Sequence, residues 1–224
     1  MRLPKSALSS DPSKGHFLSS SPPCFLCDPA SDLVYRRESS GVALAGLGPV
    51  TSGYSVVATV NHIRSAADAA LGEAPDFLSF ACEIRNVLID RYGSCLLSEH
   101  GRVPVCDDVS GTTDPHCFHA HFLLFPGAPE VESSASGHFA RVEIATSLGA
   151  ALTLAQGHEE YFLLSPNSAR FLVMTRPGRM IRQFVRMLVA DSLGQPHLAN
   201  WRAHANRDQA VAAARSLRAS RQAR

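Results

Sequence analysis

The chain has 224 residues, of which 45% are hydrophobic and 18% are charged, and its formal net charge at pH 7 is +1. This composition can form a substantial core, while the near-neutral charge and an aromatic content of only 7% argue against a nucleic-acid binder. No stretch approaches the roughly 20 apolar residues of a membrane-spanning helix. We therefore expect neither nucleic acid nor membrane as a partner.

The N-terminal segment is rich in serine and proline and lacks the apolar core of a signal peptide. We interpret residues 1–20 as a flexible leader and residues 21–224 as a single domain, and we expect the protein to be cytoplasmic. Cys24 and Cys27 then form a C-x2-C pair, CFLC, which offers two thiolates to a metal ion. The alternative is an unmetallated pair whose thiols pack in the core.

The next segments predict strands and then a helix. Residues 33–60 alternate apolar stretches with glycines and a proline, which favours two or three strands joined by turns. Residues 65–93 have apolar side chains at helical spacing and predict a helix that ends at Gly93. The face expected to be buried contains Phe77, Phe80, Ile84, Leu88 and Val87. A short strand near 94–99 leads through a turn-rich loop to the histidine-rich segment 116–127.

The second half of the chain predicts more strands and two helices. Residues 127–137 are polar and are interpreted as an exposed loop. Strands are expected near 139–145, 161–164 and 171–175, and helices near 180–193 and 206–224. The sum is an α+β fold in which helices flank an antiparallel sheet.

Residues 116–127, HCFHAHFLLFPG, raise the main functional question. His119 and His121 are two apart in an expected strand, so their side chains lie on one face. Two such imidazoles can bind a metal, attack an electrophile, or do one of each. His62, which ends VVATVNH, and His100, in SEHG, follow two other expected strands.

Four motifs follow one another along the chain: CFLC, GPVTSGYSVVATVNH, SEHG and HAHFLLFP. In this order they resemble the histidine-triad (HIT) superfamily, and most of all its bacterial branch with a zinc knuckle and an EHG motif, related to the galactose-1-phosphate uridylyltransferases. The resemblance runs from about residue 24 to 126 and continues in RQFVRMLVADSLG and NWR. It implies a HIT-like fold with added C-terminal helices.

In that branch a structural zinc ion is held by the knuckle cysteines, a histidine after the second long strand and the first triad histidine. The resemblance therefore implies that Cys24, Cys27, His62 and His119 bind Zn²⁺. Two thiolates and two imidazoles make a closed tetrahedral site with no position left for water.

The family cleaves a phosphoanhydride or related bond at the α-phosphorus of a nucleotide, through attack by the second triad histidine. The resemblance implies a nucleotidyl hydrolase or transferase with His121 as its nucleophile. The expected substrate is a dinucleoside polyphosphate, a nucleotide sugar or another nucleoside phosphate conjugate. Histidine suits this chemistry because neutral imidazole is nucleophilic near pH 7. His100 is expected to assist at the phosphate, and a hydrogen bond within its own loop is the alternative.

One position departs from the family's H-x-H-x-H pattern. Counting back from Pro126 aligns the triad with His119, His121 and Leu123, whereas a second register starts at Cys117 and makes His119 the second member. We favour the first because the second leaves the proline one residue too far away. Leucine offers no donor to a phosphate, so a second function stays open: a HIT-fold protein that binds a nucleotide or another ligand without nucleotidyl transfer, or a variant repurposed to another reaction in specialised biosynthesis.

Three further residues are candidate substrate contacts. Gln183 and Arg186 are three apart on an expected helix and share a face, although helical arginines are often simply solvated. Thr112 lies in the loop SGTTD and could present its hydroxyl to a phosphate. Members of the family are often dimers, so the resemblance also allows a homodimer.

Overall fold

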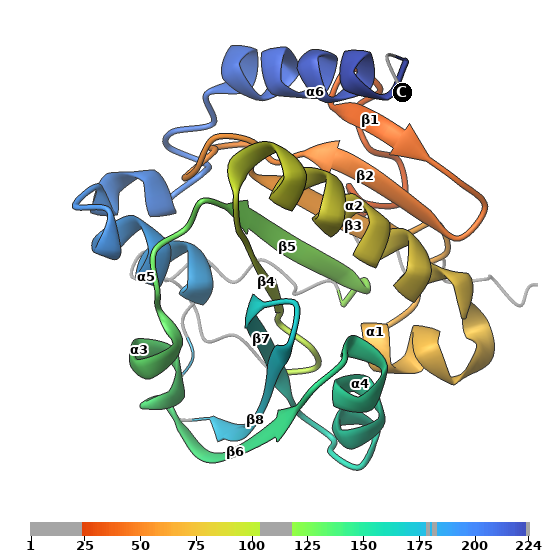
Figure 1. The fold of residues 1–224 in the computed structure, drawn as a ribbon, viewed down its shortest axis with the longest axis vertical. Helices are drawn as coiled ribbons and strands as arrows, with labels where there is room; N and C mark the ends of the chain where they lie inside the picture. Colours follow the sequence, from red (N-terminus) through yellow and green to blue (C-terminus); the bar gives the residue numbers. More distant parts are fainter. Residues whose placement is uncertain (1–23, 104–117, 178–179, 181–182, 223–224) are drawn as a thin grey trace, which may run out of the picture.

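The computed structural model describes residues 24–103, 118–177, 180 and 183–222. Its centre is one eight-stranded sheet in the order β1-β2-β3-β5-β4-β7-β8-β6, in which every neighbouring pair is antiparallel (Figure 1). The strands are β1 (Val34–Arg37), β2 (Gly41–Ala45), β3 (Ser55–Thr59), β4 (Cys95–Glu99), β5 (His121–Pro126), β6 (Phe139–Ala145), β7 (Phe162–Asn167) and β8 (Arg170–Pro177).

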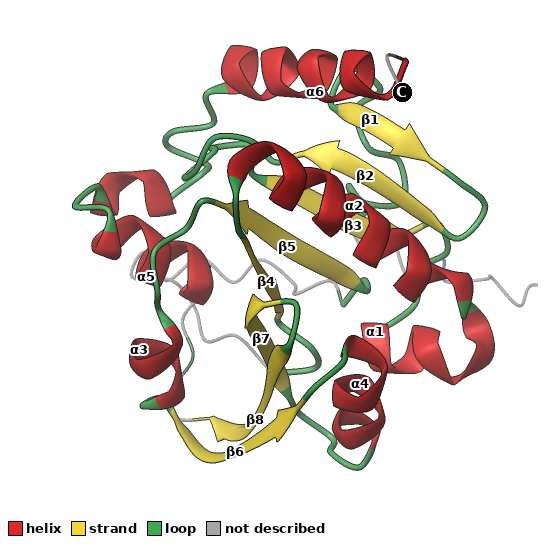
Figure 2. Ribbon diagram, viewed as in Figure 1, coloured by secondary structure: helices red, strands yellow, loops and turns green. Residues whose placement is uncertain are grey.

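Helices surround this sheet (Figure 2). They are α1 (Ala66–Asp68), the π-helical turn η1 (Ala69–Glu73), α2 (Asp76–Tyr92), α3 (Glu132–Ser136), α4 (Leu148–Gln156), α5 (Phe184–Ser192), the 3-10 turn η2 (Pro196–Ala199) and α6 (Arg207–Gln222). The predicted α+β class with an antiparallel sheet and flanking helices is confirmed. No helix within the described ranges is both long and apolar enough to cross a membrane.

The central strand β5 divides the core into two layers because its side chains alternate between the faces of the sheet. Phe122 and Leu124 point towards α2, and the ring of Phe122 stacks on Phe77 with the centroids 5.5 Å apart. Leu123 and Phe125 belong to the opposite layer, which α5 covers with Phe184 and its neighbours. Helix α4 lies in the same layer as α2, and α6 runs along the β1 edge (Figure 1).

The strands expected in residues 33–60 and near 94–99, 139–145, 161–164 and 171–175 are confirmed, with shifts of a few residues at their ends. The helix expected over 65–93 is interrupted. Gly72 has a φ of 140°, and Pro75 disfavours helical backbone in the residue before it, so α2 begins only at Asp76. Helix α2 buries the predicted face, except that Val87 is half-buried, and it ends at Gly93, which has a φ of 85°.

Two helices were not expected from the sequence. The segment 127–137, interpreted as an exposed loop, contains the short helix α3, whose Ala135 is buried. Helix α4 lies where only a turn was expected. Its N-cap is Ser147, whose hydroxyl accepts a hydrogen bond from the Ala150 N–H at 3.2 Å. The expected leader, residues 1–20, lies outside the described residues.

Candidate metal centre and histidine site

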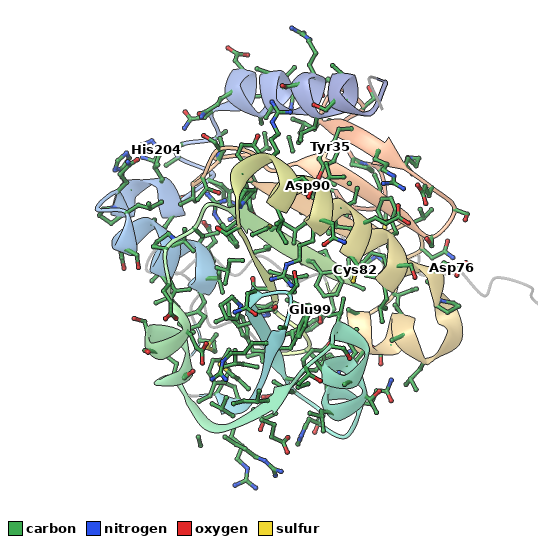
Figure 3. All side chains as sticks on the ribbon, viewed as in Figure 1. Tyr35, Asp76, Cys82, Asp90, Glu99 and His204 are labelled. Atoms are coloured by element: carbon green, nitrogen blue, oxygen red, sulfur yellow. The ribbon has the colours of Figure 1, made fainter. Side chains whose placement is uncertain are left out.

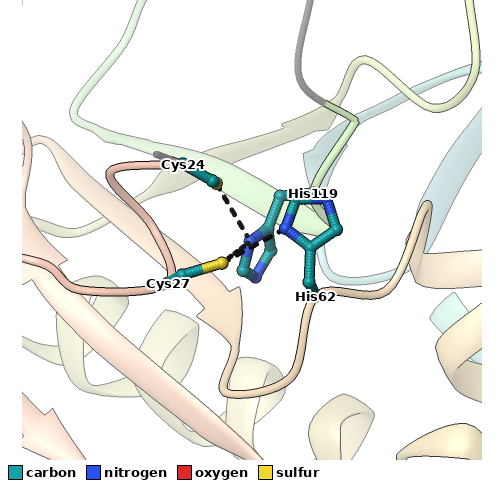
Figure 4. A group of neighbouring side chains, drawn as sticks. All are labelled: Cys24, Cys27, His62 and His119. Carbon is teal, nitrogen blue, oxygen red and sulfur yellow. Dashed lines mark hydrogen bonds between the residues drawn. The ribbon is translucent and has the colours of Figure 1, made fainter. Parts of the chain in front are cut away.

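Cys24, Cys27, His62 and His119 lie together, as expected, although 95 positions separate the first from the last. Their ligand atoms are all within 4.8 Å of one another (Figure 4). Cys24 Sγ is 3.3 Å from His119 Nδ1, and Cys27 Sγ is 3.2 Å from His62 Nδ1. Ordinary bond lengths in a tetrahedral zinc site separate sulfur and nitrogen ligands by about 3.6 Å. The four side chains could therefore hold a metal ion.

The backbone fixes the orientation of the His119 ring. His119 Nε2 lies 2.9 Å from the carbonyl oxygen of Thr59, at the end of β3. A carbonyl oxygen only accepts, so Nε2 carries the proton and Nδ1 keeps its lone pair on the side of the two sulfurs. Burial lowers the pKa of His119, against the effect of the Thr59 hydrogen bond, and this favours the neutral ring that metal binding needs.

The two thiols sit in a tight turn in which the Cys27 N–H donates to the Cys24 carbonyl oxygen at 3.0 Å. Partial desolvation and then the neighbouring Cys24 thiol raise the pKa of Cys27. Because the thiolate is the form that binds a metal ion, binding at Cys27 would release a proton. The donor set of two sulfurs and two imidazoles is the kind that zinc prefers.

Helix α6 holds the chain just after this turn. Arg207 donates to both carboxylate oxygens of Asp32, at 2.8 and 2.7 Å. Arg218 donates to the carbonyl oxygens of Ser31 and Val34. The C-terminal helix thus fixes the path of the chain between the cysteine turn and β1.

His121 is the first residue of β5 and is half-buried. Its Nδ1 lies 2.6 Å from the carbonyl oxygen of His119. Because a carbonyl cannot donate, Nδ1 carries the proton and Nε2 is the basic nitrogen of the neutral ring. His119 is therefore connected to both parts of the site, through its ring to the cysteines and through its carbonyl to His121.

His100 directly follows β4, which ends at Glu99. The β4–β5 register ends at the pair of Ser98 and Leu123, and extending it by two residues on each strand would bring His100 opposite His121. The His100 ring packs edge-on against Phe162, with the centroids 5.9 Å apart. Leu123 shares one face of β5 with His121, because it is two residues after it.

No protein-family model matches the chain. A search of curated proteins finds no significant match either.

The structure describes two of the three expected substrate contacts, Arg186 and Gln183. Arg186 is buried and donates to three backbone carbonyl oxygens, those of Gly48, Leu198 and Ala199. Gln183 begins α5, and its side-chain oxygen accepts a hydrogen bond from the Trp201 N–H at 3.4 Å. The contacts of Arg186 hold the fold together, and a phosphate contact for either residue stays a prediction. Thr112 lies outside the described residues.

Sequence reasoning missed a buried carboxylate beside this site. Glu99 of SEHG, the last residue of β4, is 2% exposed and lies inside the molecule (Figure 3). It accepts hydrogen bonds from the Ala66 N–H at 2.6 Å and from the Tyr161 hydroxyl at 2.7 Å. It thereby holds the start of α1, four residues after His62. The sequence feature that could have indicated this buried carboxylate is the glutamate in the otherwise largely apolar strand CLLSE.

Burial raises the pKa of Glu99 to about 7, against the hydrogen bonds from Ala66 and Tyr161 and the charge of Arg102, while Asp68 raises it further. The folded state then binds more protons than the unfolded state between about pH 4.5 and 7. The stability that Glu99 contributes is therefore complete below pH 4.5 and is lost as the pH rises through 7.

We expect Glu99→Gln to abolish this pH-dependent loss of stability, because glutamine does not ionise. The free energy of unfolding of the variant minus that of wild type should be about 2 to 3 kcal/mol larger at pH 8 than at pH 5. Urea unfolding at the two pH values measures the change. Glu159→Gln, at an exposed position, is the control. Parallel pH profiles for wild type and Glu99→Gln would contradict the assignment.

Proposed function

We propose that this protein is a HIT-like nucleotidyl hydrolase or transferase that cleaves a nucleoside phosphate conjugate through a nucleotidyl-histidine intermediate on His121. The observation that carries the proposal is the hydrogen bond from His121 Nδ1–H to the His119 carbonyl oxygen, at 2.6 Å. It fixes the tautomer in which Nε2 is nucleophilic. The sequence resemblance supplies the class of substrate.

In the first step, His121 Nε2 attacks the α-phosphorus and forms a P–N bond, while the bond from phosphorus to the leaving-group oxygen breaks. The leaving group takes a proton from solvent or from His100, which an extension of the β4–β5 register would bring opposite His121. Positive charge develops on the His121 ring, and the His119 carbonyl stabilises it through the Nδ1–H hydrogen bond. In the second step, water or another acceptor gives a proton to solvent or to His100, whichever protonated the leaving group, and attacks phosphorus. The P–N bond breaks and its electron pair returns to His121 Nε2.

The metal in this proposal is zinc with a structural role. Cys24, Cys27, His62 and His119 would be its four ligands, a closed set that leaves no position for substrate or water. When bound, zinc supplies a fixed anchor for the cysteine turn and for the start of β5. The chain's own groups then hold His121, because the His119 carbonyl that orients it belongs to a ligand residue.

Leu123 favours a second candidate, a HIT-fold protein that binds a nucleotide or another ligand without nucleotidyl transfer. It stands at the third position of the triad, and its apolar side chain shares a face with His121 and offers no hydrogen bond. A repurposed reaction on the same scaffold belongs with this candidate. Activity measurements separate the two functions.

The test is turnover of a substrate panel, a dinucleoside tetraphosphate, UDP-glucose and a nucleoside phosphoramidate, followed by chromatography of the nucleotide products. We expect wild type to turn over at least one of them, and His121→Asn to be slower by at least about 1,000-fold. His204→Ala, at an exposed histidine, should match wild type. Leu123→His should raise the rate, by up to about 100-fold, if a third donor is what the site lacks. Nucleotide binding without turnover by wild type would instead support the second candidate.

A further inference from the structure

Strand β6 (Phe139–Ala145) is the last strand of the sheet, at the opposite end from β1 (Figure 1). It pairs with β8 on one side, and in the described parts of the chain no strand pairs with its other side. A seven-residue edge of this kind presents a row of backbone donors and acceptors that another strand can bind.

The side chains of β6 are unusual for an exposed edge. Val142 is 38% exposed and Ile144 is 55% exposed, and the two lie on one face because they are two residues apart. Arg141 and Glu143 lie on the other face and form an ion pair at 2.7 Å. Natural edge strands usually avoid pairing through like charges, above all lysines, but this edge carries one charge of each sign.

We propose that β6 pairs antiparallel with β6 of a second copy of this chain, around a two-fold axis at Val142. In this register Arg141 lies directly opposite the partner's Glu143, and the reverse pair forms on the other side of the axis. Ile144 lies opposite the partner's Ala140, and Val142 opposite the partner's Val142. The two sheets become one continuous sheet, and the exposed apolar side chains cover each other.

The charges select this register. A shift of two residues in one direction places Arg141 against itself, and a shift in the other direction places Glu143 against itself, which is destabilising. A shift of one residue brings opposite faces of the strands side by side. Contacts within the chain fix the Glu143 carboxylate on this face, because it pairs with Arg141 and lies 3.2 Å from His158 Nε2.

The test uses sedimentation equilibrium of the full-length, zinc-loaded chain. One strand pair is a small interface, so we expect a dissociation constant in about the micromolar range and a dimer, with twice the chain mass of 24.0 kDa, at higher concentrations. Arg141→Glu and Glu143→Arg should each raise the dissociation constant at least about tenfold, because each replaces two attractive pairs by two repulsive ones. The double variant restores the attraction and should dimerise like wild type.

Two more variants complete the experiment. Val142→Lys brings two lysines together at the axis and should also dissociate the dimer, whereas Arg215→Glu, an exposed change on α6, should not. Circular dichroism confirms that each variant is folded. A wild type that stays monomeric would overturn the proposal, as would a dimer insensitive to both single reversals or a double variant that stays dissociated.

Discussion

Purified protein is expected to contain one zinc ion per chain, and Cys24→Ser is expected to lose it together with about 4 kcal/mol of stability. The figure corresponds to free zinc at about 1,000 times its dissociation constant. For a chain of this size the loss lowers the melting temperature by about 10 °C. The physical reason is that Cys24 Sγ lies 3.3 Å from His119 Nδ1, so its thiolate is one of four donors around a common point.

Elemental analysis and thermal unfolding measure the two effects, and cobalt substitution adds the absorption spectrum of a tetrahedral thiolate site. The matched control is Cys82→Ser, because Cys82 is an exposed free thiol on α2. Equal loss of metal from the two serine variants would contradict the ligand assignment. So would a wild type that takes up no zinc after reconstitution.

Arg186→Met is expected to lower the free energy of unfolding by about 3 to 5 kcal/mol. Arg186 is 3% exposed, and its guanidinium donates to the carbonyl oxygens of Gly48 at 2.6 Å, Leu198 at 2.8 Å and Ala199 at 3.0 Å. It also lies over the ring of Tyr54, 4.9 Å from the centroid. Methionine fills similar volume but donates to none of these oxygens, of which only that of Ala199 keeps another donor, the Trp201 N–H. Helix α5 therefore loses its hydrogen bonds to the β2–β3 turn and to η2.

Chemical denaturation measures the loss, and Arg215→Met, at an exposed position of α6, should have almost no effect. This experiment also tests the expectation that Arg186 binds a substrate phosphate. If it does, the variant should bind nucleotide more weakly even where it remains folded. A stable variant with impaired nucleotide binding would contradict the structural role, and an unstable one with normal binding would contradict the phosphate contact.

Much of the fold could be predicted because its signals are local. Alternating apolar residues between glycines marked the strands of residues 33–60, and the spacing of Phe77, Phe80, Ile84 and Leu88 marked the buried face of α2. The four candidate metal ligands were identified by resemblance rather than by periodicity, since no local pattern connects His62 with Cys24. The structure brings all four together.

The remaining features depend on contacts between segments distant in sequence. Glu99 accepts hydrogen bonds from Ala66 and Tyr161, which are 33 and 62 positions away. No local sequence pattern predicts either partner. From the sequence, Arg186 resembles an ordinary solvated arginine on a helix. In the structure it donates to the carbonyl oxygen of Gly48, which is 138 positions earlier. Helix α4 was missed because its short apolar sequence lies between strands and contains a glycine, which lowers helix propensity.

The most direct test of the central claim is the mass of the intact protein after brief incubation with the substrate panel and an alkaline quench, which preserves P–N bonds. The proposal predicts a gain of one nucleotidyl group in wild type, located on the peptide that contains His121, and no gain in His121→Asn. The identity of the added group names the base. An unmodified wild type that nevertheless turns over substrate, or an adduct that persists in His121→Asn, would contradict nucleotidyl transfer through His121.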